Sequence, residues 1–397
     1  MEDGLVRSIS TGLSQKGVRD HNERLLLSLV QRHGALPGSD LARRSGLSAP
    51  TVSGILRRLM AEGLLERGEP LRGKVGKPSV PICLRADGAF AFGLKIGRRS
   101  ADLVLIDLRG AIRHERSITY ATPDPDAIFA FLEEGVRGIV ATLDPGLSPR
   151  ICGLGIAAPF ELWNWPDLDP GRQPAFARWR DIDLRRMAGE RCGLPVFLMN
   201  DATAACQAEH TYGRGREFRD YAYFFLGAFI GGGIVLNNSV FEGRQGNAGA
   251  LGSLRSIGPN GESMQLVDMA SIHQLELRLR EVDLDPQQLW TEPDSWLRLS
   301  RHVDPWLGQT AQELAKAALS TCAVIDFEAI LIDGAFPPSV REDLVARVRR
   351  YVITQDTRGL ITPRIEAGSI GGKARAMGAA TRPISAQFLL NAVLSED

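Results

Sequence analysis

The chain has 397 residues, of which 44% are hydrophobic and 24% charged, a composition that excludes a disordered, fibrous or membrane-embedded protein. At about 150 residues per domain, this length predicts two or three domains. The formal net charge is zero, but residues 1–84 hold 13 Lys and Arg against 8 Asp and Glu, which leaves 34 against 39 for the remainder. A basic N-terminal module is therefore joined to an acidic body.

The cysteines are widely separated and form neither a CxxC pair nor a His-rich cluster, which predicts reduced thiols in a cytoplasmic protein. The first ten residues lack the apolar core of a signal peptide. The uncharged stretch 221–241 is broken by glycines and asparagines, so it predicts two strands and no membrane span.

Three short helices are predicted in the basic module. Apolar residues recur at helical spacing over 22–33, a second helix covers 40–45, and a turn follows at Gly46. Ser48 can cap a third helix, in which Pro50 occupies the first turn. Along that helix one apolar stripe repeats at i, i+3, i+4, i+7 and i+8, namely Val52, Ile55, Leu56, Leu59 and Met60. This order of helix, turn and helix is typical of a helix-turn-helix.

Two predicted strands, 64–67 and 80–84, flank a loop at 72–78 that is rich in Gly and Lys, as in the wing of a winged helix. The residues expected to approach base edges are Ser48, Thr51 and Ser53. The residues expected to hold phosphates are Arg57, Arg58, Lys74 and Lys77. The alternative is a small helical bundle with a solvated hairpin.

The acidic body predicts a two-lobed α/β structure. A meander of antiparallel strands over 92–119 precedes alternating helices and strands up to a helix that begins at Asp201. That order is repeated by paired strands near 221–236, helices near 264–280 and 309–324, a strand at 329–332 and a helix over 339–351. Two such halves favour two lobes with a cleft between them.

Five segments occur in an order that resembles the ROK family (repressors, open reading frames and sugar kinases). They are 92–97 (FGLKIG), 153–159 (GLGIAAP), 200–205 (NDATAA), 227–233 (GAFIGGG) and 247–252 (NAGALG). The resemblance implies an actin/hexokinase-like, ribonuclease H-like body behind a winged helix-turn-helix. Its expected domains are a DNA-binding domain over 1–84, a first lobe over 85–205 closed by 381–397, and a second lobe over 206–380.

Three nucleotide loops depart from the sugar-kinase pattern of this family. The acidic first loop Asp-x-Gly-Gly-Thr reads KIGRR at 95–99, and Gly-Thr-Gly-x-Gly reads GAFIG at 227–231. The third glycine run is reduced to DGAF at 333–336. These losses argue against phosphoryl transfer and against a nucleotide cofactor. The family's Glu-x-Gly-His reads ALGS at 250–253 and no cysteine follows in 257–266, so we expect no zinc.

Asp201 stands where the family has its catalytic base, and Asn200 precedes it. As a pair they could bind a sugar, or they could only cap the following helix. Trp163 and Asn164, in the unusual stretch 159–165, could offer an aromatic face and an amide to a sugar, or belong to the core or a lid. His210 has no visible partner in the sequence, so we expect a surface or satisfied histidine.

The sequence thus predicts a DNA-binding transcriptional regulator, a repressor of carbohydrate metabolism, with an inactive kinase-like body that senses a sugar or sugar derivative. The resemblance implies a homodimer or higher homo-oligomer, and a twofold assembly matches a palindromic operator. One alternative is an ATP-dependent sugar kinase with an accessory DNA-binding head. The other is an architectural DNA-binding protein without a ligand.

Overall fold

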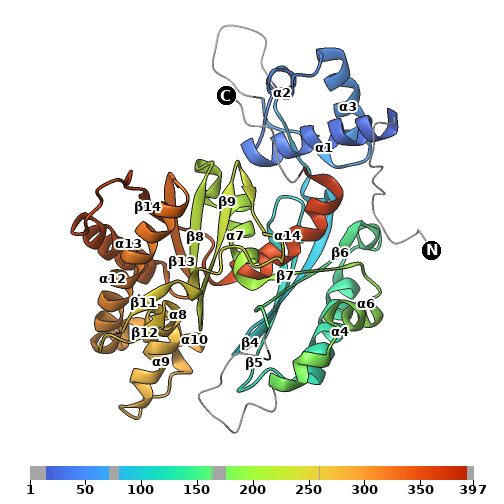
Figure 1. The fold of residues 1–397 in the computed structure, drawn as a ribbon. Helices are drawn as coiled ribbons and strands as arrows, with labels where there is room; N and C mark the ends of the chain where they lie inside the picture. Colours follow the sequence, from blue (N-terminus) through green and yellow to red (C-terminus); the bar gives the residue numbers. More distant parts are fainter. Residues whose placement is uncertain (1–14, 71–79, 162, 164–175, 259, 391–397) are drawn as a thin grey trace. The chain divides into compact units, whose positions relative to one another are not determined.

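The computed structural model describes residues 15–70, 80–161, 163, 176–258 and 260–390 (Figure 1). The chain divides into two compact units, one formed by 1–201 with 376–397 and the other by 202–375. None of the helices described is long and apolar enough to cross a membrane.

The N-terminal part of the first unit, residues 15–84, is a winged helix-turn-helix, which we call the head. Its elements are α1 (Gln15–His33), α2 (Gly38–Ser45), α3 (Ala49–Ala61), β1 (Leu65–Arg67) and β2 (Ile82–Leu84). The two strands pair antiparallel, and the predicted apolar stripe of α3 is buried at Val52, Ile55, Leu56 and Leu59 and half-buried at Met60. Helix α1 begins seven residues before the predicted start. The sequence gives no signal for its first two turns, because they are polar and carry no apolar periodicity.

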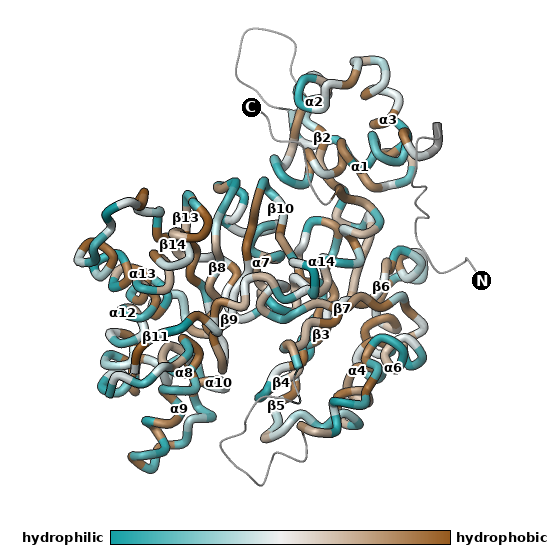
Figure 2. Tube along the Cα trace, in the orientation of Figure 1, coloured by the Kyte–Doolittle hydropathy of each residue, from teal (hydrophilic) through white to brown (hydrophobic). Residues whose placement is uncertain are grey.

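The rest of the first unit is a lobe built on a five-stranded sheet of order β5-β4-β3-β6-β7. Its strands are β3 (Phe90–Ile96), β4 (Ser100–Asp107), β5 (Ile112–Thr119), β6 (Ile151–Ala158) and β7 (Val196–Asn200). Its helices are α4 (Pro125–Thr142), α6 (Leu184–Cys192) and α14 (Ala374–Phe388). Helices α4 and α6 pack together beside this sheet, and apolar residues dominate its central strands (Figure 2). We call this part the first lobe.

Helix α14 lies with its backbone directly on the first-lobe sheet. Gly93 of β3 and Gly155 of β6 are neighbours in register. A Cβ atom at Gly93 would lie 2.1 Å from the carbonyl oxygen of Ala376, and one at Gly155 would lie 1.8 Å from that of Ala379. Only glycine at both positions allows the helix this close an approach.

The second unit holds a mixed five-stranded sheet of order β10-β9-β8-β13-β14. Its strands are β8 (Tyr221–Leu226), β9 (Ile230–Leu236), β10 (Ser239–Val240), β13 (Ala329–Gly334) and β14 (Arg364–Ala367), and a separate hairpin is formed by β11 (Arg255–Ile257) and β12 (Ser263–Gln265). Its helices are α7 (Asp201–Tyr212), α8 (Val267–Ala270), α9 (Ile272–Arg280), α10 (Gln288–Thr291), α11 (Ser295–Arg298), α12 (Ser300–Val324) and α13 (Pro338–Ile353). Figure 1 shows α12 and α13 on one side of this sheet and α7 on the other.

One predicted helix, 264–280, is interrupted in the structure. Strand β12, helix α8 and helix α9 share this segment, with extended backbone at Ser271 between the two helices. The Ser271 hydroxyl accepts a hydrogen bond from the amide of Ile230 and donates one to the carbonyl of Val267. This tertiary contact breaks the helix, and sequence periodicity does not reveal it.

The chain passes between the two units twice, after Asp201 and after Arg375. Both passages lie at the beginning of a helix, because α7 starts at Asp201 and α14 at Ala374. The second unit is therefore inserted into the first unit between β7 and the greater part of α14.

Candidate nucleic-acid interface and effector body

The first turns of α3 form an exposed polar surface. Ser48 caps the helix by accepting a hydrogen bond from the amide of Thr51 at 3.3 Å, and the two hydroxyl oxygens lie 2.8 Å apart. Ser53 and Arg57 are exposed on the same helix. Gly54 is exposed as well, and a Cβ there would meet nothing within 4 Å. These residues are free of core packing, as a surface that reads DNA requires.

Arg58 has a different environment from Arg57. Its guanidinium forms an ion pair at 2.8 Å with the buried carboxylate of Glu23, which holds α3 on α1. Its predicted contact with a phosphate remains a prediction, since the side chain is partly exposed. Lys74 and Lys77, predicted in the wing, lie outside the described residues.

Two arginines of the first lobe hold the head. Arg150 donates to the carbonyl of Gly88 at 3.0 Å and to that of Glu62 at 3.4 Å. Arg109 donates to the carbonyl of Leu84 at 2.6 Å and pairs with Glu66 at 2.5 Å. Neither residue was predicted from the sequence, because neither belongs to a local motif.

In the segment that corresponds to the first nucleotide loop of the sugar kinases, the charge of Lys95 is neutralised by a carboxylate of the same hairpin. Lys95 is buried, and its ammonium contacts the carboxylate of Asp102 at 2.8 Å and both oxygens of Ser100, the hydroxyl at 2.6 Å and the carbonyl at 3.0 Å. Lys95 and Asp102 face each other in the β3–β4 register. A lysine in place of the kinase acid is thus satisfied within its own hairpin.

The second loop, between β8 and β9, is hydrogen-bonded to the start of α9 through its own backbone carbonyls. The carbonyls of Gly227 and Ala228 accept hydrogen bonds from the first amides of α9, those of Ile272 and His273, at 3.3 and 3.1 Å. Backbone amides at a helix N-terminus are the donors that commonly bind phosphate. Here two of these donors are engaged by the loop, and the ring of Phe229 lies 5.3 Å from that of His273.

The third loop follows β13 and is organised around Asp333. This buried carboxylate pairs with Arg341 at 2.9 Å and accepts the amide of Gly371 at 2.8 Å and the hydroxyl of Tyr223 at 3.2 Å. Burial and the neighbouring Asp333 charge raise the pKa of Tyr223 well above its usual value. Asp333 therefore serves to fix the segment after β14, a role that sequence analysis did not assign.

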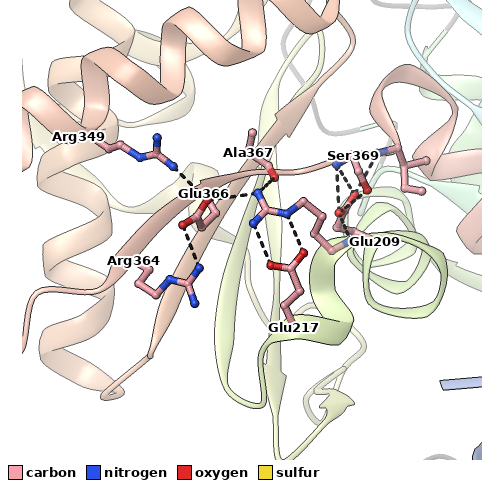
Figure 3. A network of polar contacts seen from close by, with 9 residues as sticks. Glu209, Glu217, Arg349, Arg364, Glu366, Ala367 and Ser369 are labelled. Atoms are coloured by element: carbon pink, nitrogen blue, oxygen red, sulfur yellow. Dashed lines mark hydrogen bonds and ion pairs between the residues drawn. The ribbon is translucent and has the colours of Figure 1, made fainter. Parts of the chain in front are cut away.

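A second buried carboxylate, Glu209 of α7, fixes the same segment from its other end (Figure 3). It accepts the amides of Ser369 and Ile370 and the hydroxyl of Ser369, at 2.9–3.1 Å, and the amide of Arg214 at 2.8 Å. Burial raises the pKa of Glu209, while these donors oppose that shift.

Beside this contact, Glu366 of β14 forms ion pairs with three arginines (Figure 3). Arg349 and Arg214 lie 3.0 and 3.2 Å from one carboxylate oxygen, and Arg364 lies 3.2 Å from the other. This network is satisfied internally and ties α13 and β14 to the segment after α7.

The predicted sugar-binding residues are only partly brought together. Asn200 ends β7 and Asp201 begins α7, and both are half-buried. Trp163 packs against the hydrophobic core of the first lobe, whereas Asn164 lies outside the described residues. The Nε2 atom of His210 lies 2.9 Å from the carbonyl oxygen of Asn238, so this ring nitrogen has a hydrogen-bond partner. Among the described residues no group of three or more His, Cys, Asp or Glu could hold a metal ion.

Comparison with known proteins gives two family matches. Residues 91–264 match the ROK family model, and residues 19–66 match a winged helix-turn-helix DNA-binding model. An uncharacterized protein of Sinorhizobium fredii is 26% identical over 94% of this chain and 93% of its own length. The xylose repressor of Bacillus spizizenii is 24% identical over 60% of this chain, and the match spans only 62% of that repressor.

Solved structures share the fold. A ROK family transcriptional regulator, a homologue of the Escherichia coli MLC protein, matches 95% of this chain and 98% of its own with a TM-score of 0.64 at 20% identity. A ROK family glucokinase from Streptomyces griseus matches 74% of this chain and 99% of its own with a TM-score of 0.59 at 21% identity. The predicted fold is confirmed: the chain carries a ROK family domain behind an N-terminal winged helix-turn-helix DNA-binding domain.

Proposed function

We propose that this protein is a sequence-specific DNA-binding transcriptional repressor. The observation that carries the proposal is the exposed polar surface of α3, formed by Ser48, Thr51, Ser53 and Arg57 on a winged helix. The hydroxyls are placed for base edges and Arg57 for a phosphate. Matches to the winged helix-turn-helix model and to a xylose repressor support this reading.

In this proposal the body binds a sugar or sugar derivative without phosphorylating it. Asn200 and Asp201 would hydrogen-bond the sugar, and homodimers would place two heads on a palindromic operator. Internal satisfaction of the three kinase-type loops supports a body without phosphoryl transfer. The ammonium of Lys95 is engaged by Asp102, the amides of α9 by the β8–β9 loop, and Asp333 by Arg341.

Binding of DNA from upstream of the chain's own gene tests the proposal. We expect preference over random DNA at about 150 mM salt, where non-specific binding is weak. Arg57→Ala should weaken binding to all sequences alike and lower the salt dependence by about one phosphate, whereas Thr51→Ala should change sequence preference. Arg301→Ala, an exposed arginine on α12, is the matched control. Equal affinity for both DNAs would refute sequence-specific binding.

A sugar kinase is the second candidate, favoured by Asp201 at the start of α7 and by the fold shared with a glucokinase. Incubation with Mg·ATP and glucose or xylose tests it directly. The repressor proposal expects no phosphorylated sugar, while either sugar shifts the melting temperature or DNA affinity. Sugar phosphate formation that is abolished by Asp201→Asn would establish the kinase instead.

A further inference from the structure

The C-terminal end of α14 is bound to the first helix of the head. The guanidinium of Arg24 on α1 donates to the carbonyl of Leu389 and, at 3.4 Å, to that of Ser385. The amide of Leu390 in turn donates to the hydroxyl of Ser28 at 2.8 Å. The last carbonyls of a helix lack partners within the helix and attract a cation. Arg24 therefore supplies both a donor and a favourable charge to the end of α14.

The rest of α14 is fixed to the first lobe. Its backbone rests on Gly93 and Gly155, and the side-chain amide of Gln387 donates to the carbonyl of Cys152 at 2.8 Å. The helix of 15 residues, about 22 Å long, thus joins the first-lobe sheet to α1.

The segment between head and first lobe is itself ordered by hydrogen bonds. The amide of Arg85 donates to the carbonyl of Leu64 at 2.9 Å, and the amide of Leu108 donates to that of Ala86 at 3.2 Å. Gly88 is buried, and a Cβ there would lie 3.0 Å from the carbonyl oxygen of Gly63. This segment differs from a flexible tether, whose residues would be solvated and without such partners.

We propose that Arg24 and Ser28 are positioning residues that fix the DNA-binding head on the first lobe. Together with Arg150 and Arg109, they make the head, α14 and the first lobe one rigid body. In a dimer bound to an operator with two half-sites, the distance between the two heads is then set by the positions of the two first lobes. This inference rests on the proposed function, because it assigns these residues to discrimination between half-site spacings.

The test uses DNA that the full-length wild-type chain selects from a random library. Dissociation constants are measured for the selected site, for the same site with two base pairs inserted at its centre, and for a single half-site. The variants are Arg24→Ala, Arg24→Lys and the control Arg301→Ala. We expect Arg24→Ala to lose about tenfold affinity on the selected site, ~1.4 kcal/mol, and to discriminate less against the insertion. Its affinity for the half-site stays unchanged, and Arg24→Lys restores part of the discrimination.

Hydrogen exchange on the same full-length variants separates positioning from simple destabilisation. In Arg24→Ala, exchange should accelerate in α1 and at the end of α14, while α3 keeps the wild-type rate. Faster exchange in α3, or unchanged discrimination between spacings, overturns the positioning role. Selection of a single half-site by the wild-type chain overturns it as well. Selection of no motif at all refutes the proposed function instead, and the exchange pattern still decides whether Arg24 fixes the head.

Discussion

Replacing Gly155 by alanine tests whether α14 rests on the sheet as described. The new methyl group would lie 1.8 Å from the carbonyl oxygen of Ala379, against an ordinary contact distance of 3.4–4 Å. Helix α14 must therefore move by roughly 1.6 Å, since the opposing atom belongs to its backbone. Overpacking costs about 1–3 kcal/mol, and the shift also loosens the buried Ile384 and Phe388 of α14. We expect a loss of ~3 kcal/mol or more in the free energy of unfolding.

The assay is denaturant unfolding followed by circular dichroism, with the slope m checked against the wild type. Gly54→Ala is the matched control, because it adds the same methyl group to a glycine with nothing within 4 Å. In the middle of an exposed helix this change should stabilise the head by about 0.5–1 kcal/mol. If Gly155→Ala stayed within about 0.5 kcal/mol of the wild type, where surface substitutions fall, the close contact between β6 and α14 would be wrong.

Three further predictions concern charged side chains. Arg58→Ala should destabilise the head by ~1–2 kcal/mol in thermal unfolding, because it leaves the carboxylate of Glu23 buried without its ion pair. Arg57→Ala should leave the stability unchanged, and equal effects of the two variants would contradict the different environments of the two arginines. Lys95→Met should destabilise the first lobe by ~3 kcal/mol, since Asp102 loses its ion pair with Lys95, and Lys95→Met with Asp102→Leu should recover most of this loss. A double variant no more stable than the single one would refute the pairing. The folded pKa of Glu209 is raised above 4.5, so the folded state binds the proton more tightly than the unfolded state. The contribution of Glu209 to stability is therefore largest below pH 4.5 and is lost as pH rises through the folded pKa. The difference in unfolding free energy between wild type and Glu209→Gln should shrink over that window by up to ~1.4 kcal/mol per pH unit, and a constant difference would contradict the shift.

The head could be predicted from sequence because its signals are local. The cap at Ser48, proline in the first turn and the apolar stripe from Val52 lie within a few residues of one another, and each has a direct physical meaning. The exposed face of α3 followed from the same stripe. The start of α1 did not, because a polar first turn gives no periodicity to read.

The contacts that anchor the head could not be predicted, because their partners are far apart in sequence. Arg24 and Leu389 are separated by 365 positions, and Arg150 and Glu62 by 88. Nothing near Arg24 distinguishes it from a surface arginine. By contrast, Lys95 and Asp102 lie at matching distances from a hairpin turn, so their pairing was available from the sequence once the turn had been placed.

The position of α14 in the chain also governs how the first lobe is completed during synthesis. The strands that support this helix are made early, but residues 202–375 must be translated before α14 can follow. At about 5–20 residues per second this takes on the order of ten to thirty seconds. Throughout that interval one face of the β3–β6 pair lacks its cover, and α1 lacks the contact that orients it. A nascent chain therefore exposes apolar surface that a chaperone could bind, and its head gains the contacts of Arg24 and Ser28 with the end of α14 only after the second unit has been made.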